Sequence, residues 1–221
     1  MNSAQSRSGV AALLFGDRGV PGPLRDLITR RIDNPADVDA LAEQFQRLIV
    51  VGDDSQLAMA LTRLVRIDRL DVEVGYVPRR RTTTTRIYGL SSGRRAARRA
   101  LLSSARRVPL IRDETGTAIV GSALWLPAAS QPMLHGEAIV DDTALFDGDV
   151  AGVRVEPTAA MPGLRAAVLT RRGRPRRWVV GRAAQLGSTG TLVVRDSVPA
   201  ARPTRRSAFY RNVTGWLLVS E

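Results

Sequence analysis

The chain has 221 residues, of which 44% are hydrophobic, so it can build one or two packed domains and is not disordered as a whole. It contains no cysteine and a single histidine, His135, which excludes disulfide frameworks, thiol catalysis, cysteine-ligated metal clusters and paired-histidine zinc sites. The net charge is +12 and all 33 basic residues are arginine, so chemistry that depends on a P-loop lysine or a Schiff-base lysine is also excluded.

The first third of the chain alternates between strand-like and helix-like segments. Short apolar or alternating runs predict strands over residues 10–15, 48–51 and 72–77. Helical spacing of apolar residues predicts helices over residues 24–32, from Pro35 onward and from Ser55 onward. This alternation is typical of a mainly parallel sheet with helices on its faces.

The remainder has a different pattern. A basic helix is expected over residues 93–107, and turn residues then separate strand-like runs at 118–126, 136–140, 152–156, 164–170, 178–182, 191–195 and 214–219. We therefore predict an α/β nucleotide-binding-like domain over residues 1–112 and an antiparallel, β-sandwich-like domain over residues 113–221. The last strand, which contains Trp216, is expected to close the β domain.

One turn has the composition of a cofactor site. Gly52, Asp53, Asp54 and Ser55 follow a buried-type strand and begin a helix, which is where α/β folds bind phosphates through free backbone N–H groups and the positive helix end. Two adjacent carboxylates would suit a metal-bridged phosphate or a ribose hydroxyl. Asp54 and Ser55 are equally suited to cap the helix, and the turn taken alone favours that structural role.

The order of elements and several partial motifs resemble the catalytic family of diacylglycerol kinases, which is related to NAD kinases. The family's G-G-D-G-T loop is matched by Val51-Gly52-Asp53-Asp54-Ser55, and its V-D-D-G-x-L-D turn by segments 140–142 and 145–148. The resemblance implies an α/β nucleotide domain followed by a β-sandwich domain, and a kinase that uses ATP and Mg²⁺.

Several of the family's motifs are altered in this chain. Val51 and Asp54 replace two glycines of the first loop, and residues 79–86 lack the glycines and asparagine of the family's G-T-G-N-D loop. Val198 stands where the family's late D-G-E motif has the glutamate that serves as base. Glycines in phosphate loops allow close backbone approach, so these changes argue against catalysis.

We therefore expect a degenerate, non-catalytic relative with no catalytic residue, metal ligand or required cofactor, which acts by binding a partner or a phosphorylated ligand. The alternative is an active lipid or small-molecule kinase that uses ATP and Mg²⁺. A basic nucleic-acid-binding protein is the third possibility.

The charge is concentrated in one segment, because residues 76–112 hold 11 arginines and no acidic residue. We expect its arginines to bind an anion beside the Gly52 turn, since Pro78 ends the strand that neighbours Val51. An Arg-rich solvated face in a protein from a GC-rich genome is the alternative. The candidate anion-binding residues are Arg79, Arg80, Arg81, Arg86, Arg94, Arg95, Arg98 and Arg99.

The partner expected for this segment is anionic: a phosphorylated ligand, an anionic lipid surface or an acidic protein. Nucleic acid is less favoured, because Tyr88 is the only aromatic residue among the arginines of the helix and the loop before it. No apolar run reaches the roughly 18 residues of a membrane span, and the first nine residues do not resemble a signal peptide. These observations predict a cytoplasmic protein, with peripheral membrane binding as a further possibility.

Overall fold

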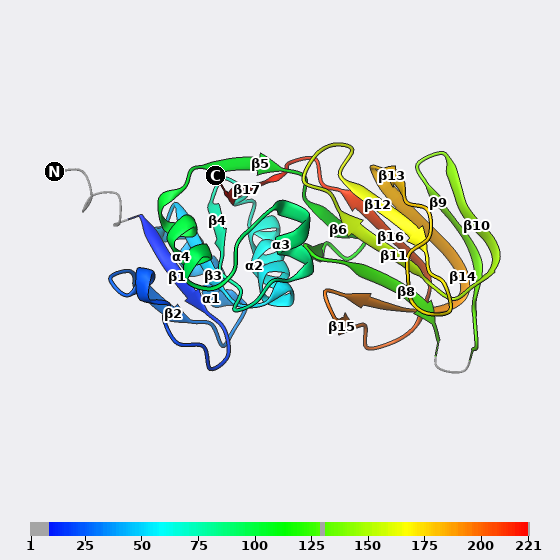
Figure 1. The fold of residues 1–221 in the computed structure, drawn as a ribbon, viewed down its shortest axis with the longest axis horizontal. Coiled ribbons are helices and arrows are strands. Elements are labelled where there is room, and N and C mark those ends of the chain that lie inside the picture. Colours follow the sequence, from blue (N-terminus) through cyan, green and yellow to red (C-terminus); the bar gives the residue numbers. More distant parts are fainter. Residues whose placement is uncertain (1–8, 129–130, 221) are drawn as a thin grey trace. The chain divides into compact units, whose positions relative to one another are not determined.

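The computed structural model describes residues 9–128 and 131–220. The chain divides into two compact units (Figure 1). The first unit runs up to Val108 and also contains the segment from Thr214 onward, and the second unit is Pro109–Val213. The first holds a mainly parallel sheet with helices and the second an antiparallel sheet, which confirms the predicted fold class. The chain thus leaves the first unit once and returns to it.

The first unit is built on a six-stranded sheet of order β2-β1-β3-β4-β17-β5. All neighbouring strands are parallel except β17 and β5, which are antiparallel. Its elements in chain order are β1 (Val10–Leu14), the 3-10 helix η2 (Gly22–Leu24), β2 (Ile28–Arg31), α1 (Ala36–Gln44), β3 (Arg47–Val51), α2 (Asp54–Arg66), β4 (Glu73–Tyr76), α3 (Thr83–Tyr88), α4 (Gly93–Leu102), β5 (Ala105–Val108) and β17 (Trp216–Val219).

The centre of this sheet is buried on both faces. All five residues of β1 are buried, and alternate residues from Val10 to Leu14 share a core cluster with the alanines of α4. Helix α4 lies very close to β4, because a Cβ atom added to Gly75 would be 2.8 Å from the Cβ of Ala100. Continuous apolar strands of this kind are typical of a parallel sheet covered on both sides.

Several segments differ from the sequence-based expectation. The basic helix expected over residues 93–107 ends at Leu102 as α4, and Ala105–Val108 forms the strand β5. The helix expected over residues 24–32 is instead η2 followed by the edge strand β2. The threonine-rich loop contains α3, because Thr82 and Thr85 form a capping box that satisfies the first N–H groups of a short helix. The last strand, β17, does not close the β domain: it inserts between β4 and β5, where its apolar side chains complete the first sheet.

The second unit is an 11-stranded antiparallel sheet. Its core is formed by alternate apolar residues that surround Trp125 and Phe209, whose rings stack 5.7 Å apart. The strands are β6 (Ile111–Asp113), β7 (Ala118–Ile119), β8 (Ala123–Pro127), β9 (Leu134–Val140), β10 (Thr143–Val150), β11 (Val153–Pro157), β12 (Leu164–Val168), β13 (Val179–Gly181), β14 (Ala183–Arg195), β15 (Val198–Pro199) and β16 (Thr204–Arg211).

Candidate functional site

The Gly52 turn is organised by a capping box. The helix cap is Asp53, whereas Asp54 and Ser55, the caps considered from the sequence, lie in the first turn of α2. The Asp53 Oδ1 accepts from the backbone N–H of Gln56 at 3.1 Å and from the Ser55 hydroxyl at 2.7 Å. The Gln56 side chain in turn accepts from the backbone N–H of Asp53 at 2.9 Å. It lies so close to Gly52 that an added Cβ there would be 2.5 Å from Gln56 Oε1. The turn therefore uses Asp53, Ser55 and Gln56 to begin the helix.

Asp54 joins three elements at the C-terminal edge of the sheet. Its Oδ1 accepts from the Tyr76 hydroxyl at 2.7 Å, and its Oδ2 accepts from the backbone N–H of Thr84 at 3.3 Å. Burial, together with the negative charge of Asp54, raises the pKa of the Tyr76 hydroxyl far above its usual value. Tyr76 consequently remains a proton donor, and Asp54 connects the first turn of α2 to the end of β4 and the first turn of α3.

A pocket of about 910 Å³ opens at the same edge of the sheet. Val51, Val77 and Pro78, where β3 and β4 end, are among its lining residues. Four arginines and one acidic residue, Asp17, are among the residues that line it. The arginines come from three separate segments, namely the β1–β2 connection, the end of β4 and the start of α4: Arg18, Arg25, Arg79 and Arg94. We call this the arginine pocket.

Local bonds hold the walls of the arginine pocket in place. The carbonyl of Pro78 accepts from the backbone N–H of Gly93 at 2.7 Å, which joins the end of β4 to the start of α4. Gly93 has φ +60°, a conformation that glycine adopts without steric cost. In the β1–β2 connection, which carries Arg18 and Arg25, the Arg31 guanidinium donates to the carbonyl of Gly16 and thereby ties β2 to the glycine-rich stretch. Each of the two regions that carry the arginines is thus joined by a hydrogen bond to a strand end of the sheet.

The arginines predicted from the sequence are distributed over several surfaces. Arg79 and Arg94 line the arginine pocket, and Val51 places the Gly52 turn next to it, although Gly52, Asp53, Asp54 and Ser55 are not among its lining residues. Arg99 contacts Ser91 and lines a separate pocket of about 140 Å³. The side chains of the other five predicted arginines are exposed: Arg80, Arg81, Arg86, Arg95 and Arg98.

Two arginines of the pocket were missed by sequence reasoning. Arg18 and Arg25 lie on the β1–β2 connection, outside the segment in which the arginines are concentrated. The available signal was the glycine- and proline-rich stretch that follows the first strand, because loops after parallel strands lie at the edge where α/β folds bind ligands. Their charge was not apparent because residues 1–75 contain nine arginines and 11 acidic residues.

The aspartates of the altered family motifs in the second unit support turns. Asp196, at the place of the late D-G-E motif, accepts from the backbone N–H groups of Val120, Gly121 and Ser122 at 3.0, 2.7 and 2.9 Å. Asp141 accepts from the backbone N–H groups of residues 182 and 183 at 3.0 Å.

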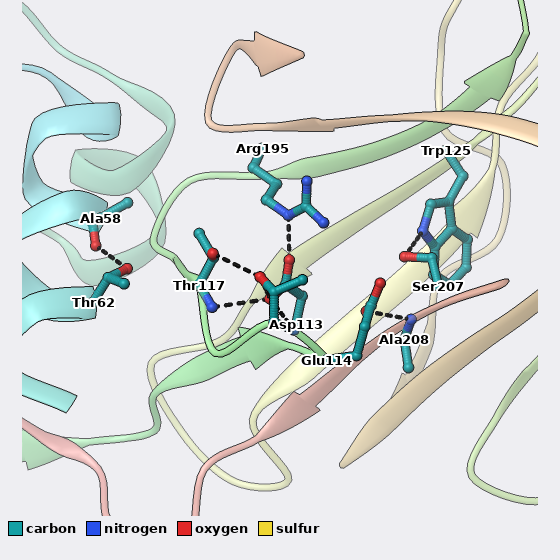
Figure 2. Close-up of polar contacts among 10 residues, drawn as sticks. Ala58, Thr62, Asp113, Glu114, Thr117, Trp125, Arg195, Ser207 and Ala208 are labelled. Atoms are coloured by element: carbon teal, nitrogen blue, oxygen red, sulfur yellow. Dashed lines mark hydrogen bonds and ion pairs between the residues drawn. The ribbon is translucent and has the colours of Figure 1, made fainter. Parts of the chain in front are cut away.

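Asp113 has a similar structural role in the second unit. Its carboxylate is fully buried and accepts from Thr117 and from Arg195, as Figure 2 shows. The neighbouring Glu114 accepts from the backbone N–H of Ala208 at 2.9 Å. A buried carboxylate such as that of Asp113 needs these donors, so it stabilises the connections between the segments it joins.

No helix in the described part of the chain is long and apolar enough to cross a membrane. No protein-family model matches the sequence, and no curated protein matches it either. Solved structures do match. The chain is similar to a diacylglycerol kinase from Bacillus anthracis str. Sterne with a TM-score of 0.72 and 11% sequence identity, over 97% of both chains.

It is also similar to an NAD kinase from Archaeoglobus fulgidus, solved in complex with ATP, with a TM-score of 0.66 and 12% identity over 96% of this chain and 93% of that one. Yeast NADH kinase, solved with NADH, gives a TM-score of 0.57 and 9% identity over 96% and 83% of the two chains. The chain therefore has the fold shared by diacylglycerol kinase-like and NAD kinase proteins.

Proposed function

We propose that the protein binds a phosphorylated ligand in the arginine pocket and does not transfer its phosphoryl group. The observation that carries this proposal is the convergence of Arg18, Arg25, Arg79 and Arg94 on one pocket at the C-terminal edge of a parallel sheet. None of the four guanidinium groups makes an ion pair with a residue in the described ranges. A multivalent anion would relieve their mutual repulsion and accept the paired N–H donors of each guanidinium.

The side chains of the Gly52 turn are already hydrogen-bonded within the protein, which supports binding without catalysis. A kinase of this fold would need the turn to approach the phosphates of ATP and its carboxylates to help hold Mg²⁺. Here the Asp53 carboxylate and the Gln56 amide cap α2, and both oxygens of Asp54 accept hydrogen bonds from the protein. Val51 and Asp54 also occupy positions where the resembling family has glycine. These residues fit a helix cap and do not fit a magnesium–nucleotide site.

The proposal is tested by calorimetric titration with pyrophosphate, as a multivalent phosphate probe, at low salt. The double variant Arg79→Gln/Arg94→Gln should bind at least tenfold more weakly, because each charge-assisted hydrogen bond contributes roughly 1.5–3 kcal/mol. Arg95→Gln/Arg98→Gln is the matched control, since it removes the same number of charges and both residues are exposed on α4 but do not line the pocket. Equal affinity of the double variant and the unaltered protein would refute the arginine pocket as the binding site.

An active ATP-dependent lipid or small-molecule kinase is the second candidate, favoured by the shared fold and by Asp53 in the position of the family's loop aspartate. It predicts micromolar binding of ATP with Mg²⁺ that is lost in Asp53→Ala. Because that change also removes a helix cap, at a cost of about 1 kcal/mol, Asp53→Ser serves as the variant that retains a capping oxygen but no carboxylate. Micromolar ATP binding by the unaltered protein that is lost in both variants would overturn the claim that the Gly52 turn does not hold a magnesium–nucleotide complex.

A further inference from the structure

We propose that the first unit contains a second anion site, separate from the arginine pocket, that binds a single tetrahedral oxyanion such as inorganic phosphate. The site is the pocket of about 140 Å³ that Arg99 lines, which we call the small pocket. Six of its lining residues have polar side chains: Tyr76, Tyr88, Ser91, Arg99, Arg106 and Ser220.

The small pocket lies where several elements of the first unit end. Tyr76 is the last residue of β4 and Tyr88 the last residue of α3, while Ser220 directly follows β17. Helix α4 contributes Arg99, and β5 contributes Arg106. Strands β4 and β17 are parallel neighbours, so the pocket adjoins the C-terminal ends of two parallel strands, where α/β folds bind ligands.

Backbone hydrogen bonds fix two walls of the small pocket. Gly89 ends α3 with φ +69°, and the N–H groups of Gly89 and Leu90 both donate to the carbonyl of Thr85. At the end of β17, the N–H of Ser220 donates to the carbonyl of Ser104 at 3.1 Å. The pocket therefore does not have to be assembled when a ligand binds, which lowers the entropic cost of binding.

The polar groups of the small pocket are mainly donors. The Arg99 guanidinium donates to the Ser91 hydroxyl at 3.2 Å, and the Arg106 guanidinium donates to the Ser220 hydroxyl at 3.0 Å. Each serine oxygen thus accepts from an arginine and can direct its own O–H to a ligand. No carboxylate is among the lining residues in the described part of the chain. Two guanidinium groups and two hydroxyl groups therefore suit an anion with several acceptor oxygens.

Burial strengthens this preference for an anion. Tyr76, Tyr88 and Ser220 are only 3%, 4% and 8% exposed, so much of the lining is shielded from water. Charge-assisted hydrogen bonds are stronger where solvent screening is reduced. An anion would also offset the repulsion between the two guanidinium groups that line the same cavity.

The volume of the small pocket limits the ligand to a small ion. Pockets that bind organic ligands have volumes of about 300–1,000 Å³, and the small pocket lies well below that range. The arginine pocket, at about 910 Å³, lies within it. Phosphate and sulfate are compact and present four oxygens, so they fit the small pocket, whereas pyrophosphate and phosphorylated organic molecules do not.

The site is tested by equilibrium dialysis of the full chain with radiolabelled phosphate, in the Arg79→Gln/Arg94→Gln background that disables the arginine pocket. Arg99→Gln/Arg106→Gln should weaken phosphate binding at least tenfold, because it removes two charge-assisted donors. Arg95→Gln/Arg98→Gln is the matched control: it removes the same number of charges, and both residues are exposed and line neither pocket. Equal effects of the two double variants would overturn the proposal.

A second variant keeps both arginines and fills the small pocket. Ser91→Leu should weaken phosphate binding at least tenfold by occupying the space of the ion, with the net charge unchanged. Ser92→Leu is its control, because Ser92 does not line the pocket and its side chain makes no capping hydrogen bond to α4. Unchanged binding in Ser91→Leu would show that phosphate is held elsewhere and would refute the site.

The position of the ion is tested by the indole N–H signals in nuclear magnetic resonance. The Trp216 ring contacts the ring of Tyr88, with 5.6 Å between their centres, so phosphate in the small pocket should shift the Trp216 signal. Trp125 and Trp178 lie in the second unit and serve as internal references. Phosphate that binds without shifting the Trp216 signal would contradict the assignment.

Competition tests the size limit in the same background. Sulfate should displace phosphate from the small pocket, and pyrophosphate should do so at least tenfold less well. Pyrophosphate that competed as strongly as sulfate would overturn the proposal of a single-ion site. Because the arginine pocket is disabled in these measurements, the two sites can fail independently.

Discussion

Replacing Asp196 with alanine should destabilise the second unit more than any other removal of a single carboxylate that we propose here. Asp196 is 6% exposed, and its two oxygens accept three backbone N–H groups from residues 120–122. Alanine would leave these donors without the acceptor. A hydrogen bond to a charged group contributes roughly 1.5–3 kcal/mol and the three bonds are not additive, so we expect a loss of about 3–5 kcal/mol in the free energy of unfolding.

Asp196→Asn separates charge from shape. Asparagine keeps one acceptor oxygen and tolerates the observed φ of +45°. Its NH₂ group, however, must face a backbone N–H donor. The decrease in the free energy of unfolding should therefore be smaller than that of Asp196→Ala. Asp142→Ala, an exposed position, is the control and should change stability by less than about 0.5 kcal/mol.

The assay for these variants is denaturant unfolding of the full chain, followed by circular dichroism and by tryptophan fluorescence. Two probes are needed because the two units can unfold in separate transitions. An Asp196→Ala variant within 1 kcal/mol of the unaltered protein would show that water or rearranged backbone replaces the carboxylate, and would refute the reasoning.

Two further predictions concern the first unit. Gly75→Ala should lower the free energy of unfolding by about 1–3 kcal/mol, because the added Cβ would lie 2.8 Å from the Cβ of Ala100. Adding Ala100→Gly should restore part of this loss. If the effects of the two changes were simply additive in the double variant, the two positions would not be in direct contact. Because the pKa of Tyr76 is raised in the folded state, its contribution to stability is complete below the unfolded pKa of about 10 and is lost as the pH rises above it, by up to roughly 1.4 kcal/mol per unit. Tyr76→Phe should flatten this alkaline decline in denaturation experiments, and an unchanged slope would exclude Tyr76 as its cause.

Local sequence patterns determined much of the fold. The apolar runs of β1 and β3, the Gly-Asp turn before α2 and the change to closely spaced strands were sufficient to predict a parallel α/β unit and an antiparallel β unit. The motifs around Gly52 and Asp141 also indicated the kinase-like fold that the solved structures share. Such patterns succeed because periodicity, capping and turn chemistry act over a few neighbouring residues.

The tertiary structure alone decided where distant segments meet. Nothing local in β17 distinguishes a strand that closes the β unit from one that inserts between β4 and β5. The arginine pocket likewise combines Arg18 and Arg25 with Arg79 and Arg94, and Asp196 binds a loop about 75 residues earlier in the chain. Strand pairing and ligand pockets depend on contacts between residues far apart in sequence, whose free energy is set by the packed fold and leaves no signal in the flanking residues.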